Sequence, residues 1–314
     1  MYRLRFLLSI GATLFFSLAL CSTTQAAARA YVSVTGSDAN PCTYSLPCRL
    51  FQHAHDVVDD SGEVIALTSG GYGTLTITKN VTISGVGVSA VSSPYSSESA
   101  ITIATAGITV GLRSIIVRAF GAGTGGNGIV VTAVGNLHVE DCVISGFGVT
   151  GINVGLTADG SHIFIKDTIM KNNGVYGIII ATTTGIVRAS IDNCRAERNA
   201  FHGFFASRNS RVTINRSVAS GNSGIGFNAR SDVSGETAEL NCEECVSSNN
   251  IDGFDAIGTS SGVATMRVSH STATNNTGFG FVQSGTGVFN TLGNNTVRGN
   301  GTPTSGTITT ITLQ

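Results

Sequence analysis

The chain contains no tryptophan, only four prolines among its 314 residues, and almost no excess charge, with a net charge of −1. A nearly neutral chain has no overall attraction to nucleic acid or to a membrane surface, so we expect neither as a partner. Charged residues are also scarce, at 12%, whereas 41% of the chain is hydrophobic, which excludes the composition of a disordered protein. Long runs of helical periodicity are missing too. What remains is a chain rich in glycine and in β-forming side chains.

The N-terminus carries the pattern of a secretory signal peptide. Arg3 and Arg5 precede an apolar run from Phe6 to Leu20, and the small residues Ala26 to Ala28 follow. We therefore predict a signal peptide over residues 1–28. No second apolar run approaches the roughly 20 residues of a membrane span. The sequence thus predicts a secreted, periplasmic or cell-envelope protein with no membrane span after signal removal.

A glycine followed by an apolar triplet recurs every 23 to 27 residues, at Gly128, Gly151, Gly177, Gly203, Gly226, Gly253 and Gly280. Such a repeat cannot bury its own inward side chains, but stacked neighbours can cover them. We predict an all-β protein, a right-handed parallel β-helix of about nine to ten coils, with the hand expected from crossover chirality. A β-propeller is excluded because its blades need roughly 40 residues. The predicted core column is Ile129, Ile152, Ile178, Phe204, Phe227, Phe254 and Phe281.

Further columns support the repeat. One holds small side chains, at Cys142, Thr168, Cys194, Ser217, Cys245, Ser271 and Thr296. Another holds asparagines, which tolerate left-handed backbone and are expected to stack at one turn: Asn172, Asn199, Asn222, Asn250, Asn276 and Asn300. Three less regular coils are expected around residues 64–87, 101–111 and 114–121, and a last strand at 308–313.

The segment before the coils is expected to cover the open end of the solenoid. Leu50, Ala54, Val57 and Val58 fall on one face at helical spacing, which predicts a short amphipathic helix within residues 49–58. The predicted domains are therefore the cap over residues 29–62 and the β-helix over residues 63–314. Cys42 and Cys48 close a small loop, and we expect a disulfide between them in an exported protein.

Two segments, YVSVTGSDANPC…PCRLFQHA and GEVIALTSGGYGTLTITKNVTISG, resemble the N-terminal part of bacterial exported right-handed parallel β-helix repeat proteins of the pectin-lyase-like group. The resemblance implies the fold and export. It does not imply an activity, because the group includes polysaccharide enzymes of several kinds and many proteins without known function. Of the polygalacturonase motifs, Phe201-His202-Gly203 is the nearest match, without the paired aspartates or the Arg-Ile-Lys. The calcium-ligand set of pectate lyases is not found either.

Other polar groups have a structural interpretation. Asp141 and Asp167, one coil apart, could form a calcium or acid–base site, but Glu140 and Lys166 beside them alternate in sign, as in a cross-strand charge ladder. No clear motif indicates a cofactor, although calcium stays an alternative. No metal site is predicted. We expect buried free thiols at Cys142, Cys194, Cys242 and Cys245, with a Cys242–Cys245 bridge as the alternative. His53 and His55 are expected on the surface.

The outer face of the first strand of each coil is the candidate site. The predicted catalytic residues are His202, Arg230, Asp252 and Asp255, as acid–base or charged groups. The predicted substrate-binding residues are Asn153, Tyr176, Phe205 and Asn228, because rings stack on the apolar faces of sugars and amides bond hydroxyls. Two functions fit. The first is a non-catalytic scaffold that binds a polysaccharide or cell-surface glycan. The alternative is a polysaccharide lyase or glycoside hydrolase that uses the same face.

Overall fold

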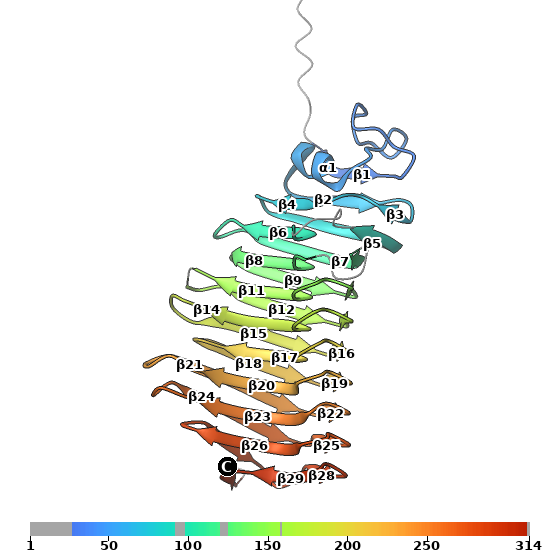
Figure 1. Cartoon of the computed structure of the whole chain (residues 1–314). Coiled ribbons are helices and arrows are strands. Elements are labelled where there is room, and N and C mark those ends of the chain that lie inside the picture. The colour runs from blue at the N-terminus through green and yellow to red at the C-terminus, as the bar shows by residue number, and fades with distance from the viewer. Residues whose placement is uncertain (1–26, 92–97, 120–124, 158, 313–314) are drawn as a thin grey trace, which may run out of the picture.

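The computed structural model describes residues 27–91, 98–119, 125–157 and 159–312 as a parallel β-solenoid with one short helix at its N-terminal end (Figure 1). The predicted fold class is confirmed. The predicted signal peptide lies outside the described residues, except for its last two positions. None of the described helices is long and apolar enough to cross a membrane.

The first-strand column of the repeat, together with the strands at both ends of the solenoid, forms a ten-stranded sheet in which every pairing is parallel. Its strands are β4 (Leu75–Ile77), β6 (Ile101–Ala104), β8 (Ile129–Ala133), β11 (Ile152–Leu156), β14 (Ile178–Thr182), β17 (Phe204–Ser207), β20 (Ile225–Ser231), β23 (Asp252–Gly258), β26 (Phe279–Gly285) and β29 (Thr302–Ser305).

The second sheet has twenty strands and contains two stacks. The long stack comprises β2 (Val58–Ala66), β5 (Val81–Val91), β7 (Thr109–Arg118), β9 (Asn136–Glu140), β12 (His162–Lys166), β15 (Val187–Asp192), β18 (Ser210–Asn215), β21 (Thr237–Glu243), β24 (Val263–Ser269), β27 (Val288–Thr291) and β30 (Ile308–Thr310), with β1 (Ala27–Val32) and β3 (Gly70–Gly71) at its start. The short stack comprises β10 (Val143–Ser145), β13 (Ile169–Lys171), β16 (Arg195–Glu197), β19 (Val218–Ser220), β22 (Val246–Ser248), β25 (Thr272–Thr274) and β28 (Thr296–Arg298).

The number of coils is slightly lower than predicted. The solenoid has about eight turns rather than nine to ten. One reason is that Ser114, taken as the start of a separate coil, lies inside β7 at a left-handed corner with φ of 52°. β7 therefore continues into the short stack, where Ile116 pairs with Val143.

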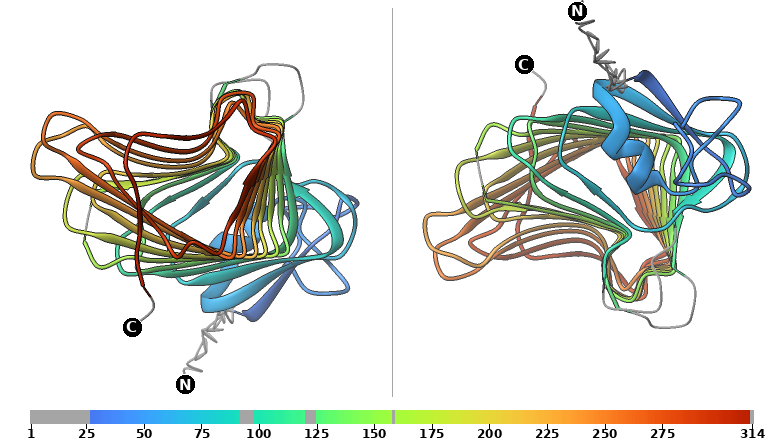
Figure 2. Two further views of the ribbon diagram at one scale, coloured as in Figure 1. Left: turned by 90° about the horizontal axis from the view of Figure 1, so that it is seen from below. Right: turned by 90° about the horizontal axis from the view of Figure 1, so that it is seen from above.

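The inward column of the ten-stranded sheet forms the core as predicted. Ile152, Ile178 and Phe204 are register partners, and all are at most 1% exposed. Phe204, Phe227 and Phe254 stack with centroid separations of 4.9 and 4.8 Å and nearly parallel planes. Burial of each such ring stabilises the fold by about 2–3 kcal/mol. Figure 2 shows that the coils superimpose along the axis, which keeps these columns continuous.

A left-handed residue marks the corner between the long and short stacks at Ser114 and in six further coils: Asp141, Asp167, Asn193, Arg216, Glu244 and His270. The predicted small column follows immediately, except that its predicted last member, Thr296, pairs with Thr272, and Asn295 takes the place next to Ser271. The Thr168 hydroxyl and the Cys142 thiol each donate to a carbonyl two residues back, at 2.8 and 3.2 Å. Small donors therefore fit this corner. The four cysteines in the coils are buried and free, so Cys242 and Cys245 are not bridged.

The asparagine column forms a hydrogen-bonded ladder at the turns that lead from the short stack into the ten-stranded sheet, here called the ladder turns. Asn199 Nδ2 donates to Asn222 Oδ1 at 2.9 Å, and the Asn199 backbone N–H donates to the same oxygen. The predicted member Asn172 is wrong, because its neighbour Asn173 is buried and bonds Asn199 Oδ1. Asn172 instead supplies the left-handed backbone, with φ of 55°.

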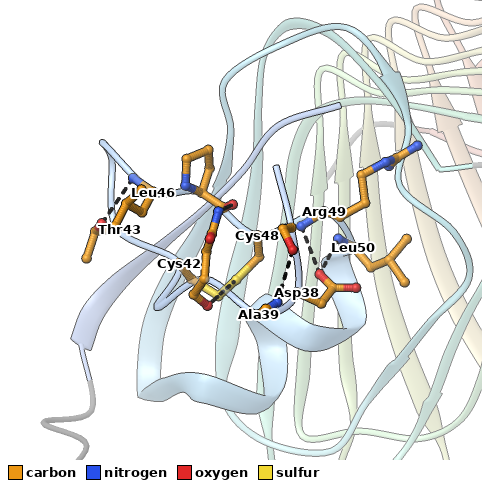
Figure 3. Close-up of a disulfide and its surroundings, with 11 residues drawn as sticks. Asp38, Ala39, Cys42, Thr43, Leu46, Cys48, Arg49 and Leu50 are labelled. Atoms are coloured by element: carbon orange, nitrogen blue, oxygen red, sulfur yellow. Dashed lines mark hydrogen bonds between the residues drawn. A yellow bond between two sulfur atoms is a disulfide. The ribbon is translucent and has the colours of Figure 1, made fainter. Parts of the chain in front are cut away.

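The N-terminal cap contains helix α1 (Phe51–Val57) and the predicted disulfide between Cys42 and Cys48 (Figure 3). Asp38 Oδ1 accepts the N–H groups of Arg49 and Leu50, which orients the chain into the helix. The helix lies across the end of the solenoid (Figure 2).

The predicted faces of helix α1 are partly wrong. Leu50 and Val57 are exposed, whereas Phe51 packs on Tyr72 with ring centroids 4.8 Å apart. His55, expected on the surface, is 1% exposed. It is buried because its two ring nitrogens contact Asp56 Oδ1 at 2.9 Å and the Thr78 N–H at 3.3 Å.

Candidate functional site

The candidate site lies where the ladder turns meet the outer face of the ten-stranded sheet. Phe205, Asn228 and Asp255 are register partners on β17, β20 and β23, as the repeat predicts. Tyr176 and His202 lie in the ladder turns that lead into β14 and β17. Seen along the axis, the outline of the coils bends inward beside these turns (Figure 2). Asn228 and Asp255, which point outward from this face, are buried.

Four rings from two adjacent coils form an aromatic cluster, which comprises Tyr176, Phe201, His202 and Phe205. Phe201 and His202 lie 3.8 Å apart and Tyr176 and Phe205 5.2 Å apart, centroid to centroid. The cluster is graded in exposure. Phe201 is 44% exposed and Tyr176 is half-buried, whereas His202 and Phe205 are buried. Ring surface at a turn with a buried support behind it suits the stacking of a flat apolar face.

His202 is held in one orientation inside this cluster. Its Nδ1 accepts the backbone N–H of Ile225 at 3.0 Å, so a neutral ring carries its proton on Nε2. Burial, with a smaller contribution from the charge of Arg230, lowers the pKa of His202 from 6.5 to about 4. His202 is therefore uncharged at neutral pH, where Nε2 is a hydrogen-bond donor.

Two polar side chains on adjacent strands of this face point outward and are nevertheless buried. Asn228 is fully buried, and neither its Nδ2 nor its Oδ1 has a hydrogen-bond partner among the described residues. Asp255 is 2% exposed, and its Oδ1 is also unpartnered. Burial, reinforced by the charge of Asp252, raises the pKa of Asp255 well above 3.8. Buried polar groups without partners are rare and costly in folded proteins.

The remaining predicted residues are engaged elsewhere or lie apart. Arg230 Nε bonds both carboxylate oxygens of Asp232 at 2.9 and 2.8 Å. Asp252 Oδ1 accepts the Phe279 N–H at 2.7 Å. Asn153 is separated from Phe205 along the column by Ile179. The structure thus brings together Tyr176, His202 and Phe205, with Asn228 and Asp255 on the next two strands.

Phe201 belongs to the site but was not predicted as part of it. The sequence could have indicated it by position, because Phe201 directly precedes His202 at a ladder turn. Val149, Val175 and Ile251 occupy the corresponding position in other coils. Val149 and Ile251 are exposed there, at 38% and 49%, while Gly224 and Gly278 hold the position in two other coils. Exposed apolar side chains at a turn are a feature that inward and outward strand patterns do not reveal.

Metal-binding groups gather at one place within the described ranges. Cys42, Cys48 and His53 have ligand atoms within 4.8 Å of one another. Because the two sulfurs form the disulfide, they are not thiolate ligands. Asp167, considered above for calcium, accepts a hydrogen bond from Asn193 Nδ2 at 2.6 Å, and Asp141 accepts one from Ser114 at 2.9 Å. These contacts are of the kind that stabilises a stacked corner.

Comparison with known proteins identifies the class. The model of the right-handed β-helix region matches residues 122–300, more than half of the chain, and the chain belongs to this family. No curated protein sequence matches it.

Solved structures with the same fold include the pectate lyase Pel9A, at 15% identity and a TM-score of 0.53, with 88% of this chain and 81% of that chain covered. The A-module of the mannuronan C-5 epimerase AlgE4 from Azotobacter vinelandii is 13% identical, with a TM-score of 0.53 and coverage of 81% and 91%. Tailspike protein 2 of the Escherichia coli O157:H7 bacteriophage CAB120 is 14% identical, with a TM-score of 0.56; 76% of this chain covers 35% of that protein. At these identities the likeness shows the fold alone.

Proposed function

We propose that this protein is an exported β-helix that binds a glycan at the aromatic cluster and does not cleave it. The observation that carries the proposal is the difference in solvent exposure between the rings of the aromatic cluster. Phe201 and Tyr176 present ring surface, while His202 and Phe205 hold those rings from behind. Sugars are recognised by this combination of ring faces for their C–H surfaces and fixed polar groups for their hydroxyls.

Export is the second part of the proposal. The charged, apolar and small-residue sequence of positions 1–28 supports it. The Cys42–Cys48 disulfide supports it as well, because disulfides persist in oxidising compartments.

The polar groups favour binding over turnover. An acid–base pair needs two titratable groups that reach the same substrate atoms, about 5–10 Å apart in glycosidases. Here Asp252 accepts a hydrogen bond from the Phe279 N–H, and Arg230 donates one to Asp232. His202 Nδ1 accepts a hydrogen bond from the Ile225 N–H. Each of these groups has a structural partner, which favours a positioning role over acid–base chemistry beside the exposed rings.

A polysaccharide lyase or hydrolase remains the alternative, and one observation favours it. Burial raises the pKa of Asp255, which favours the protonated carboxyl that a general acid requires. Its side chain is almost entirely covered, so a substrate would reach it only after neighbouring groups moved.

Binding and turnover can be measured on one panel of polysaccharides. The panel includes pectate and mannuronan, the polymers in the names of two proteins with this fold, together with neutral polymers. Affinity is measured by retardation in polysaccharide-containing native gels, and turnover by the release of reducing ends and by absorbance at 235 nm for unsaturated products. Phe201→Ala tests the exposed ring, and Asp255→Asn tests the carboxyl. The exposed Ile251→Ala, on another ladder turn, is the matched control.

We expect retardation by at least one polymer, a loss of about tenfold in affinity for Phe201→Ala, and little change for Ile251→Ala. No product should form with any variant. Product formation that disappears in Asp255→Asn would overturn the binding-only proposal in favour of the enzyme. Equal affinities of the wild type and Phe201→Ala would remove the aromatic cluster as the site.

A further inference from the structure

A second set of chemistry-bearing side chains lies on the outer face of the long stack, away from the aromatic cluster. His138 on β9 and Phe164 on β12 stack with centroids 4.9 Å apart and planes inclined by 15°. The register places Gly111 before this pair and Ser190 after it. Because neither neighbour has a large side chain, each end of the ring pair opens onto free space.

Hollows occupy both of these positions. One of about 380 Å³ is lined by Thr82, Gly111, Arg113 and His138 among others. Another, of about 260 Å³, lies beside the exposed ring of Phe164 and is also lined by Arg188, Ser190 and Arg211. The second hollow is smaller than the roughly 300–1,000 Å³ of a pocket for a drug-sized ligand, so it suits a single small ring.

Arg188 and Arg211 are direct register partners on β15 and β18, and His162 precedes them in the same column. Neighbouring strands lie about 4.8 Å apart, where like charges repel one another. Neither guanidinium has an ion pair or a side-chain hydrogen bond within the described ranges.

The nearest carboxylates lie within electrostatic range of the pair but form no direct ion pair with it in the described ranges. Arg188 interacts in this way with Asp159, and Arg211 with Glu239. Glu239 also accepts Arg267 Nη1 at 2.7 Å and Asn241 Nδ2 at 3.0 Å. Two exposed guanidinium groups that no carboxylate contacts, beside a hollow and a ring face, suit an anion from outside the chain.

We propose that this face binds an acidic polysaccharide, with one sugar ring stacked on Phe164 and its carboxylate or sulfate ester held by Arg188 and Arg211. The row of hollows along the solenoid axis favours an extended chain over an isolated small anion. This site lies on a different sheet from the aromatic cluster and does not depend on the function proposed there.

The test is affinity electrophoresis of the full chain in native gels that contain polygalacturonate, dextran sulfate or neutral dextran. The double variant Arg188→Ala/Arg211→Ala removes the pair. The matched control Arg118→Ala/Arg298→Ala removes the same charge at two exposed arginines outside this face. Phe164→Ala removes the ring, and Phe201→Ala reports on the aromatic cluster.

We expect one or both acidic polymers, but not dextran, to retard the wild type. Retardation by polygalacturonate alone assigns a carboxylate, and retardation by dextran sulfate alone assigns a sulfate ester. The Arg188→Ala/Arg211→Ala variant should lose at least tenfold in affinity and Phe164→Ala about threefold, whether or not Phe201→Ala is also present, while the control pair keeps full retardation. The proposal would be overturned by equal losses in both double variants, by unchanged affinity of the Arg188→Ala/Arg211→Ala variant, or by equal retardation of the wild type in dextran.

Discussion

The two outer faces of the solenoid use the same strand alternation and have opposite environments. On the ten-stranded sheet, the outward residues Asn228 and Asp255 are almost without exposed surface. On the long stack, the outward residues Phe164, Arg188 and Arg211 are exposed. The pleat of a strand therefore determines whether a side chain points inward or outward. The curvature of the coil determines whether an outward side chain is exposed to solvent. One face holds polar groups in a dry setting, while the other holds charges in solvent.

The largest expected effect is a pH response that belongs to the dry face. His202 is neutral in the fold and has a pKa of about 4, against 6.5 when unfolded. Its contribution to stability is complete above pH 6.5 and is lost as the pH falls toward 4, by at most about 3 kcal/mol. The variant His202→Gln, which lacks a titrating ring, should not show this loss.

The measurement is the free energy of unfolding in urea at pH 7 and pH 4 for the wild type and His202→Gln. Asp255 titrates in both proteins, so its opposite trend cancels in the difference between them. His162→Gln, on the exposed face, serves as the control. If His202→Gln and the wild type lose the same stability on acidification, His202 is not in a dry environment.

An intermediate effect is expected at Asn228, whose buried amide has no hydrogen-bond partner among the residues that the structure describes. Asn228→Leu keeps the volume of the side chain and removes the desolvated polar atoms, so it should stabilise the fold by about 1–3 kcal/mol. Thr213→Leu, on the exposed face of β18, should change stability by less than about 0.5 kcal/mol. Thermal unfolding of both variants checks this contrast. Destabilisation by Asn228→Leu would show that the amide is satisfied in solution.

The smallest effect is expected for the arginine pair. Arg188→Ala relieves the repulsion with Arg211 and should raise stability by about 0.3 kcal/mol at low salt. The gain should fade in 1 M salt, where screening acts over about 3 Å. Chemical denaturation at two salt concentrations measures it, and a loss of stability at low salt would show that the attraction between Arg188 and Asp159 outweighs the repulsion between the two arginines.

The sequence predicts the fold well because the inward column repeats in every regular coil. Phe204, Phe227 and Phe254 could be placed from spacing alone, as could the Cys42–Cys48 disulfide from its short loop. The corner at Ser114 was not predicted because its coil has Ala100 before β6, where the regular coils have a glycine. Asn172 and Asn173 are adjacent, so spacing could not separate the buried one from the left-handed one.

The candidate site was only partly predictable. Alternation placed Phe205, Asn228 and Asp255 on one outward column, and the register confirms that placement. Their burial depends on how the coils bend beside the ladder turns, which no single strand encodes. His55 shows the same limit, since the Thr78 N–H that it contacts comes from 23 residues further along the chain.

The most direct test of glycan binding without cleavage is a crystal structure of the protein with an oligosaccharide cut from the polymer that binds most tightly. We expect a sugar ring on Phe201 and Tyr176, with every glycosidic bond intact after prolonged incubation. A sugar bound only away from these rings, or a cleaved oligosaccharide in the crystal, would contradict it.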